Sequence, residues 1–242
     1  MLTSASFVRV ATAILLVSVA ELCASPAQLN IAIRSDPKTL NPLLVEEESG
    51  ELIRYLTSGV LMRIHRVTQA AEPELATSWS WRDGGRTLHL NLRKGVRFSD
   101  GSAFTAHDVV HTFERIMDPS IKSPLADAFR SGKGGVVAKV SGLYAVSLTF
   151  PATLPGLERL LDQVPILCRT SSQPEKAVLG PFVVQSQAAG THVTLARNPN
   201  FWKKDAAGRA LPYLSGIRLH VQSNRDLEAL RFRRGELDMI RG

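Results

Sequence analysis

Two histidines and an aspartate in the pattern His-Asp-x-x-His are the residues of this sequence best suited to chemistry. They are His107, Asp108 and His111, and the pattern differs by one methylene from the His-Glu-x-x-His helix of zinc proteases. Side chains one helical turn apart lie on the same face, so the two histidines could bind one metal ion together. A catalytic zinc also needs a third ligand and a free carboxylate that activates water. A zinc hydrolase using His107 and His111 is therefore one hypothesis for the function.

The helix that must carry these histidines offers a simpler interpretation. Its apolar residues are Val109, Val110, Phe113, Ile116 and Met117. On a helical wheel they gather nearly opposite His107 and His111, which would then face water. Thr105 and Asp108 have the spacing of a capping box, in which the aspartate binds the backbone amide of the threonine and is not free to activate water. We therefore expect neither a metal site nor a catalytic residue, and we favour two solvent-exposed histidines.

The composition is that of an ordinary folded protein. The chain has 242 residues, of which 44% are hydrophobic, so it can form one large domain or two small ones. Its formal net charge of +7 could indicate binding to nucleic acid or to an anionic membrane surface. The arginines are scattered, however, and no basic stretch interleaved with aromatic residues marks a binding face. We expect no nucleic-acid partner.

The first 27 residues have the features of an export signal. Arg9 precedes an apolar run from 10 to 20, and small residues follow at 24–27. The run is too short to span a bilayer. Cys23 lacks the small preceding residue that bacterial lipoprotein signals require. We therefore expect a signal peptide at 1–27 and a soluble protein exported to the periplasm, without a lipid anchor.

Cys168 is the only cysteine left if Cys23 leaves with the signal peptide. No disulfide framework can then form within the mature chain, even in an oxidising compartment. Because Cys168 follows the apolar residues 164–167, we interpret it as a small buried hydrophobe. A catalytic thiol is the alternative, but nothing nearby in the sequence marks a histidine partner.

Strand patterns recur along the rest of the chain. Apolar and polar residues alternate, with turn residues between the runs, and this predicts strands at 29–34, 87–92, 136–140, 144–150, 180–185, 192–197 and 217–222. Trp79 and Trp81, followed by the turn residues Asp83 and Gly84, predict a hairpin that leads into the second of these strands.

Helical periodicity is present in two further segments. Apolar residues at helical spacing predict a helix at 51–64. A second helix is expected at 225–234, stopped by Gly235, with a final strand at 236–240. No internal repeat is found. The order of elements therefore indicates a mixed α and β fold built on hairpins.

The stretch around the two histidines resembles one protein family in detail. Residues 72 to 119 read EPELATSWSWRDGGRTLHLNLRKGVRFSDGSAFTAHDVVHTFERIMDP. This stretch is similar to the signature region of the family 5 solute-binding proteins, the oligopeptide- and dipeptide-binding proteins that serve bacterial ABC importers. The matching positions are Pro73, Leu75, Ala76, Ser78, Trp79, Asp83, Gly84, Leu92, Arg93, Lys94, Gly95, Phe98, Asp100, Gly101, Thr105, Ala106, Asp108 and Val109. Turns, glycines and a helix cap account for the most conspicuous of them, so we expect this motif to hold the fold.

Shorter pieces agree with the family along nearly the whole mature chain. They are LNP at 40–42, SP at 123–124, LGPF at 179–182, LARNPNFW at 195–202, LPYLSGIRL at 211–219 and RRGELDMI at 233–240. Two positions depart from the family pattern. Phe182 stands where the family usually has tyrosine, and Leu125 stands where some peptide binders carry an aromatic residue that borders the ligand.

The resemblance implies an α/β (mixed α+β) fold, namely a periplasmic binding protein type II-like lobe with an inserted extra domain. The first ligand-binding lobe would comprise 28–48 and 175–242, and the inserted domain 49–174. Family members are considerably longer, and 235–240 falls where the family's chain approaches the hinge to the second lobe. We therefore expect a chain truncated before the second ligand-binding lobe, either because the sequence is partial or because the gene product is.

The function implied by the resemblance is capture of a peptide or similar small solute for an ABC importer, with delivery to permease subunits in the inner membrane. Such a protein is a monomer when complete, and it needs no cofactor and no covalent chemistry. By position, the expected ligand-binding residues are Glu46, Glu48, Leu125 and Arg241. Glutamate carboxylates could meet a basic group of the solute, whereas the plainer interpretation is solvated loop charges. A nonfunctional truncated fragment and the zinc hydrolase using His107 and His111 are the alternatives.

Overall fold

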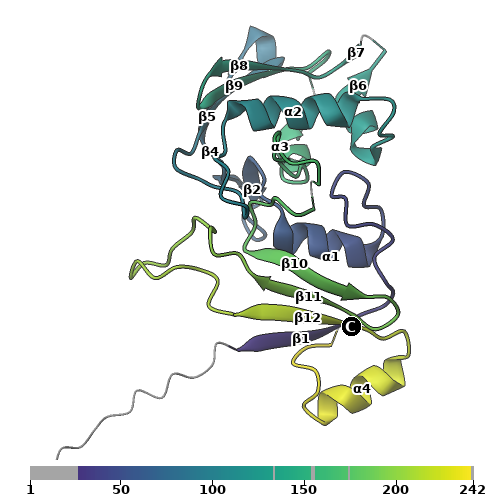
Figure 1. The fold of residues 1–242 in the computed structure, drawn as a ribbon. Coiled ribbons are helices and arrows are strands. Elements are labelled where there is room, and N and C mark those ends of the chain that lie inside the picture. The colour runs from purple at the N-terminus through teal and green to yellow at the C-terminus, as the bar shows by residue number, and fades with distance from the viewer. Residues whose placement is uncertain (1–26, 133, 154–155, 174, 241–242) are drawn as a thin grey trace, which may run out of the picture.

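Two four-stranded sheets dominate the structure, a computed structural model that describes residues 27–132, 134–153, 156–173 and 175–240 (Figure 1). The first sheet, in the order β1-β12-β11-β10, contains β1 (Gln28–Ile33), β12 (Gly216–Val221), β11 (His192–Arg197) and β10 (Phe182–Ala188). The second sheet, in the order β4-β5-β9-β8, contains β4 (Ala76–Arg82), β5 (Thr87–Leu92), β9 (Ala145–Thr149) and β8 (Val137–Gly142). In the first sheet β1 pairs with β12 in parallel, and every other pairing in the two sheets is antiparallel. The predicted mixed α and β character is confirmed.

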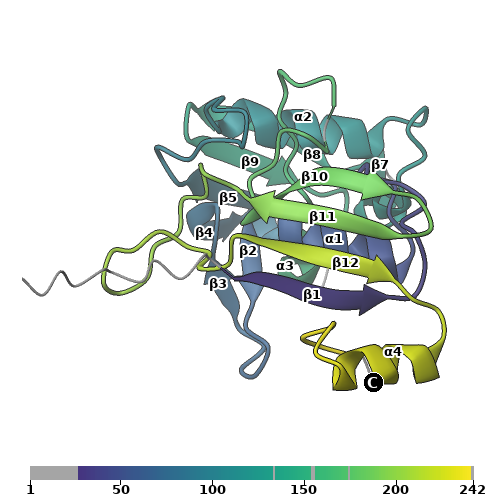
Figure 2. The same ribbon diagram turned by 60° about the horizontal axis from the view of Figure 1, so that its bottom comes forward.

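Helices and short elements connect and cover the two sheets. They are α1 (Glu48–Thr57), β2 (Met62–Ile64), β3 (Ala71–Pro73), η1 (Asp83–Gly85), α2 (Ala106–Met117), η2 (Pro124–Phe129), β6 (Arg130–Ser131), β7 (Gly134–Gly135), α3 (Leu157–Leu161) and α4 (Arg225–Arg233). Helix α2 packs on the second sheet, α1 packs on the first sheet, and α4 lies beside β1 (Figure 2). Among the described residues, no helix has the length and apolar character needed to cross a bilayer.

Each sheet has its own core. The larger core lies under α2 and the second sheet, and among its members are Leu88, Leu90, Phe98, Phe104, Val109, Phe113, Ile116, Val146 and Leu148. The smaller core lies between the first sheet and α1, and consists of Ile31, Ile33, Ile53, Phe182, Val193, Leu195, Ile217 and Leu219. Alternate residues of a strand point to opposite faces of a sheet. Arg218 and His220 of β12 therefore lie on the face opposite the smaller core.

The hairpin predicted with Asp83 and Gly84 in its turn is confirmed. Strands β4 and β5 pair in antiparallel fashion through η1. Asp83, Gly84 and Gly85 have φ values of 53°, 65° and 84°. Three successive left-handed residues favour glycine and aspartate, which tolerate that conformation at low cost. The turn chemistry therefore explains why the chain reverses here.

The predicted helix at 51–64 is too long, because α1 ends at Thr57. The carbonyl of Gly59 accepts from the amide of Ile166 (2.9 Å), and the carbonyl of Val60 accepts from the amide of Leu75 (3.2 Å). These carbonyls would be needed for further helical turns. Distant segments take them, and the chain continues as strand β2 paired with β3.

The predicted strand at 236–240 is also wrong in extent. It is reduced to one parallel bridge between Met239 and Ile31. Beside the bridge, the amide of Asp238 donates to the carbonyl of Asn30 (2.9 Å), and the amide of Asn30 donates to Asp238 Oδ2 (2.7 Å). A side-chain carboxylate thus takes a donor that would otherwise extend a backbone ladder, so the pairing stops.

Candidate functional site

The loop between β1 and α1 carries the predicted ligand-binding residue Glu46 and leads to Glu48 at the start of α1, and short-range hydrogen bonds fix its shape. Asn41 Oδ1 accepts from the amide of Leu43 (3.1 Å), and the Asn41 carbonyl accepts from the amide of Leu44 (3.0 Å). This is the turn that an asparagine before proline favours. Leu43 is buried in the larger core. The loop is therefore anchored at its centre before it reaches the glutamates.

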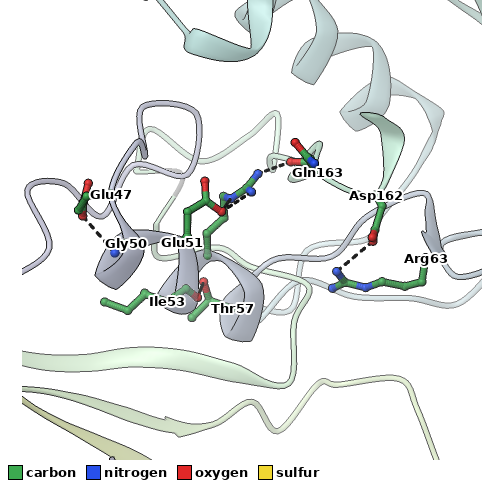
Figure 3. Close-up of polar contacts among 9 residues, drawn as sticks. Glu47, Gly50, Glu51, Ile53, Thr57, Arg63, Asp162 and Gln163 are labelled. Carbon is green, nitrogen blue, oxygen red and sulfur yellow. Dashed lines mark hydrogen bonds and ion pairs between the residues drawn. The ribbon is translucent and has the colours of Figure 1, made fainter. Parts of the chain in front are cut away.

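Glu47, which the sequence analysis did not single out, holds the end of this loop. Its Oε1 accepts from the amides of Gly50 (3.0 Å) and Lys38 (3.1 Å), so it caps α1 (Figure 3). A Cβ at position 50 would lie 2.5 Å from Glu47 Oε1, and only glycine leaves room for this cap. The signal was present in the sequence, because an acidic residue just before a helix complements its dipole.

The predicted residues Glu46 and Glu48 flank this cap and are both exposed. Glu48 begins α1, where negative charge is favourable. Leu125 lies in η2, half-buried against the larger core. The hydroxyl of Ser123 donates to the carbonyl of Leu43 (2.8 Å) in a buried contact. That bond brings the segment of Leu125 against the loop of Glu46. Arg241 lies outside the described residues.

Helix α1 is fixed on the side away from the first sheet as well (Figure 3). Arg54 Nε donates to Glu51 Oε2 (3.0 Å), and the Arg54 guanidinium also donates to the carbonyl of Gln163. Next to Gln163, Asp162 Oδ1 pairs with Nη1 of Arg63 in β2 at 3.2 Å, which ties the segment that holds Arg54 to β2. On the other side, Ile53 packs in the smaller core. Glu48 and the loop that carries Glu46 are therefore positioned by a helix that is held from two sides.

The LGPF segment crosses the end of α1 at very short range. The amide of Gly180 donates to the carbonyl of Thr57 (2.8 Å), and Asn198 Nδ2 donates to the carbonyl of Gly180 (2.8 Å). A Cβ at Gly180 would lie 2.3 Å from the carbonyl carbon of Thr57. Phe182, which replaces the family's tyrosine, is buried in the smaller core. Gly180 is therefore needed for the close approach of the two backbones.

The His-Asp-x-x-His motif is built around a helix cap. Asp108 is buried, and its Oδ2 accepts from the amide (2.8 Å) and the hydroxyl (3.1 Å) of Thr105. Its Oδ1 accepts from the amide of Arg169 (3.0 Å). The predicted capping box is confirmed. Both carboxylate oxygens are engaged in holding backbone, so Asp108 is not a free base.

The two histidines differ in their surroundings. His107 is exposed as expected, whereas the expectation was wrong for His111, which is half-buried. Burial lowers the pKa of His111, and the neighbouring positive charge of Arg115 lowers it further. Within the described part of the chain, no three His, Cys, Asp or Glu side chains are placed to hold a metal ion. The zinc hypothesis therefore has no third ligand among these residues.

Cys168 is buried, as predicted. Its Sγ lies 3.3 Å from the hydroxyl oxygen of Ser102 and 3.2 Å from that of Thr170. A thiol packed between two hydroxyls in this way behaves as a small core residue with weak polar contacts.

A family model described as bacterial extracellular solute-binding proteins, family 5 middle, matches residues 70–242. A probable ABC transporter-binding protein of Deinococcus radiodurans is 28% identical to the chain over 227 residues, which cover 84% of this chain and 38% of that protein. The oligopeptide-binding protein OppA of Bacillus subtilis is 26% identical over 237 residues, which cover 87% of this chain and 42% of OppA. The match thus extends over most of the described residues.

A solved structure gives the same result for the fold. The substrate-binding protein CtaP of an ABC transporter from Listeria monocytogenes superposes with a TM-score of 0.77 at 21% identity, covering 88% of this chain and 44% of CtaP. The predicted fold, a lobe of the type II periplasmic-binding-protein kind, is confirmed. The chain spans less than half the length of each of these three proteins.

Proposed function

We propose that this chain supplies part of the substrate-binding component of an ABC importer. The reason is that the chain belongs to the bacterial extracellular solute-binding proteins of family 5. The solute would be a peptide or a similar small molecule. The observation that carries the proposal is the family match over residues 70–242, together with a fold that presents an acidic loop beside a half-buried leucine.

The proposed contacts follow from the geometry of the loop. Glu46 and Glu48 are exposed on either side of the cap residue Glu47. Their carboxylates would accept charge-assisted hydrogen bonds from an amine or basic side chain of the solute. Leu125, held near this loop by the bond from Ser123 to Leu43, would contact an apolar part of the solute. We assign Arg241 to the same site by its position after the segment 235–240, which resembles the family, although it lies outside the described residues.

No covalent step is needed for this function. In a two-lobed binding protein, a solute that contacts both lobes stabilises the closed population, and the closed form then engages the permease. We propose ABC permease subunits in the inner membrane as the partner, a monomeric state for the complete protein, and export to the periplasm through the signal peptide 1–27. These assignments rest on the family, whose members are extracellular.

The proposed lobes follow the two sheets. We place 28–48 and 175–242 in the first ligand-binding lobe and 49–174 in the inserted domain. Helix α1 starts at Glu48 and buries Ile53 in the core of the first sheet. In this proposal the helix joins the two units, and Ile53 packs against the first lobe.

The test is the charge preference of solute binding. The protein that carries this sequence is purified from the exported fraction, and calorimetry compares lysine-containing peptides with otherwise identical glutamate-containing peptides. Glu46→Gln and Glu48→Gln should each weaken binding of the lysine peptides by about tenfold, the worth of one charge-assisted hydrogen bond, and leave the glutamate peptides nearly unchanged. Glu114→Gln, an exposed change on α2, is the control. Equal effects on both peptide sets, or none on either, would remove these residues from the site.

A further inference from the structure

A polar cleft of about 220 Å³ lies between the loop after β1, helix α2 and the segment 167–172. Among the residues that line it are Asn41, His111, Arg115, Cys168, Ser171 and Ser172. Three separate segments of the chain contribute to this cleft. It is separate from the exposed carboxylates of Glu46 and Glu48, which do not line it.

Among the residues that line the cleft, Asn41, His111 and Arg115 can donate hydrogen bonds. His111 and Arg115 are one turn apart on α2, so their side chains lie on the same face. In the part of the chain that the structure describes, no carboxylate lies within 4 Å of the Arg115 guanidinium. Asn41 Oδ1 is occupied by the amide of Leu43, which leaves the Nδ2 group of Asn41 as its free donor.

The nearest acidic groups do not neutralise these donors. Both oxygens of Asp108 are taken by Thr105 and by the amide of Arg169. Glu114 is exposed on α2 and does not line the cleft. Asp118 interacts electrostatically with Arg115, but its Oδ1 accepts from the amide of Ser120 (2.8 Å) and it does not line the cleft either. The charged groups that act on His111 are Arg115, Glu114 and Asp108 of α2, and Arg169 of the segment packed against it. The positive charges of both arginines disfavour the protonated imidazole.

We propose that this cleft is a binding subsite for a small oxyanion, a carboxylate or a phosphate group, held between Arg115 and His111. Arginine binds such groups through two parallel hydrogen bonds. The imidazole supplies a third donor when it is protonated, and the amide of Asn41 supplies a fourth. The subsite goes beyond the proposed capture of solutes at Glu46 and Glu48, since a free oxyanion is sufficient to occupy it.

Binding at this subsite is coupled to protonation of His111. Burial, and then the positive charges of Arg115 and Arg169, hold the pKa of His111 below its ordinary value of 6.5. An anion placed among these groups reverses the effect of the two arginines and favours the imidazolium. The pKa of His111 is therefore higher in the bound state, and affinity for the anion rises as the pH falls through that bound-state pKa.

The test follows the imidazole protons of His107 and His111 by NMR while acetate or sulfate is added, each being a probe that does not titrate near neutral pH. Either anion should raise the pKa of His111 in a saturable way and leave His107, the exposed histidine one turn earlier, unchanged. The probe with the larger effect assigns the subsite to carboxylates or to tetrahedral oxyanions. Equal shifts at both histidines would show general screening, and no shift would show no site. Both results overturn the proposal.

Variants separate a specific contact from a change of net charge. Arg115→Gln should weaken the apparent binding of the effective anion by about tenfold, the usual effect of losing one hydrogen bond to a charged group. Arg115→Lys keeps the charge but cannot make the two parallel hydrogen bonds, and should retain only part of the affinity. Arg130→Gln removes the same charge at a half-exposed arginine outside the cleft, 3.9 Å from Asp127, and should behave like the unchanged protein. Equal weakening by Arg115→Gln and Arg130→Gln would contradict the subsite.

Discussion

At the scale of single residues, Asp108 shows how a motif that looks catalytic can be structural. One carboxylate holds the N-terminus of α2 through Thr105 and the segment after the second sheet through the amide of Arg169. Asp108→Ala would leave buried donors without partners, so we expect a loss of about 3 kcal/mol in the free energy of unfolding. His107→Ala, on the exposed face of the same helix, should change it by less than about 0.5 kcal/mol. Urea titrations of both variants measure this, and comparable losses would contradict the assignment.

A second prediction at this scale concerns His220 and the pH dependence of the free energy of unfolding. Its Nε2 lies 3.1 Å from Asn30 Oδ1, and its Nδ1 lies 3.4 Å from Arg231 Nη2. Arginine can only donate, so Nδ1 accepts and the ring is neutral. Burial, followed by Arg231, Arg218 and His192, lowers the pKa of His220 below 6.5. The unfolded chain then binds the proton more readily. Stability from this group is complete above pH 6.5 and is lost as the pH falls toward the lowered pKa.

The measurement is the difference in urea midpoint between about pH 7.5 and pH 5. His220→Gln removes the titration and keeps a side chain that can hydrogen-bond. The midpoint of the variant should fall less on acidification than that of the unchanged protein. His111, whose pKa is also lowered, contributes equally to both and so cancels in the comparison. An identical fall in both proteins would show that His220 is not the acid-sensitive group.

The contacts that could be predicted from the sequence are those between residues close together in the chain. The cap formed by Thr105 and Asp108 depends on residues three apart, and Cys168 follows an apolar run, so both were predictable. The third partner of Asp108 is the amide of Arg169, which is 61 residues away in the sequence. The same holds for the cleft at Arg115, which is assembled from three distant segments. No local pattern carries such information.

At the scale of elements, the crossing between α1 and the LGPF segment sets how the two sheets are joined. Gly180→Ala would place a Cβ 2.3 Å from the carbonyl carbon of Thr57, where backbone must move. We expect a loss of about 3 kcal/mol from this overpacking. Gly142→Ala is the matched control, because its Cβ would meet only Ala145 Cβ at 3.7 Å. Thermal unfolding of both variants provides the comparison, and a neutral Gly180→Ala would mean that the crossing is looser than described.

Elements were predictable where their own residues decide them. The hairpin of β4 and β5 has both the alternation and the turn residues, and it forms as predicted. The helix predicted at 51–64 was too long because the apolar residues after Thr57 keep helical spacing. The carbonyls of Gly59 and Val60 accept instead from the distant amides of Ile166 and Leu75. The strand predicted at 236–240 does not form because the Asp238 carboxylate accepts from the amide of Asn30, which a backbone carbonyl would otherwise bind.

At the scale of the whole molecule, the arrangement of the two sheets follows from the family and not from any local pattern. The first sheet combines β1 with strands from β10 onward, and the second sheet is formed by the chain between them. Hydrophobic alternation predicts strands but not their partners. The resemblance at 72–119 implied the type of fold but no strand order, and residues of that motif form the turn and the helix cap at the second sheet and α2.

The central claim is that the protein captures a solute without transforming it, and calorimetry with a mixed peptide library tests this most directly. The protein that carries this sequence, purified from the exported fraction, is titrated with the library, and mass spectrometry then compares the peptides before and after incubation, with and without added zinc. We expect saturable heat of binding and an unchanged library under both conditions. Peptides cleaved in the presence of zinc and spared by a variant with alanine at positions 107 and 111, or no binding by a folded protein, would contradict the account.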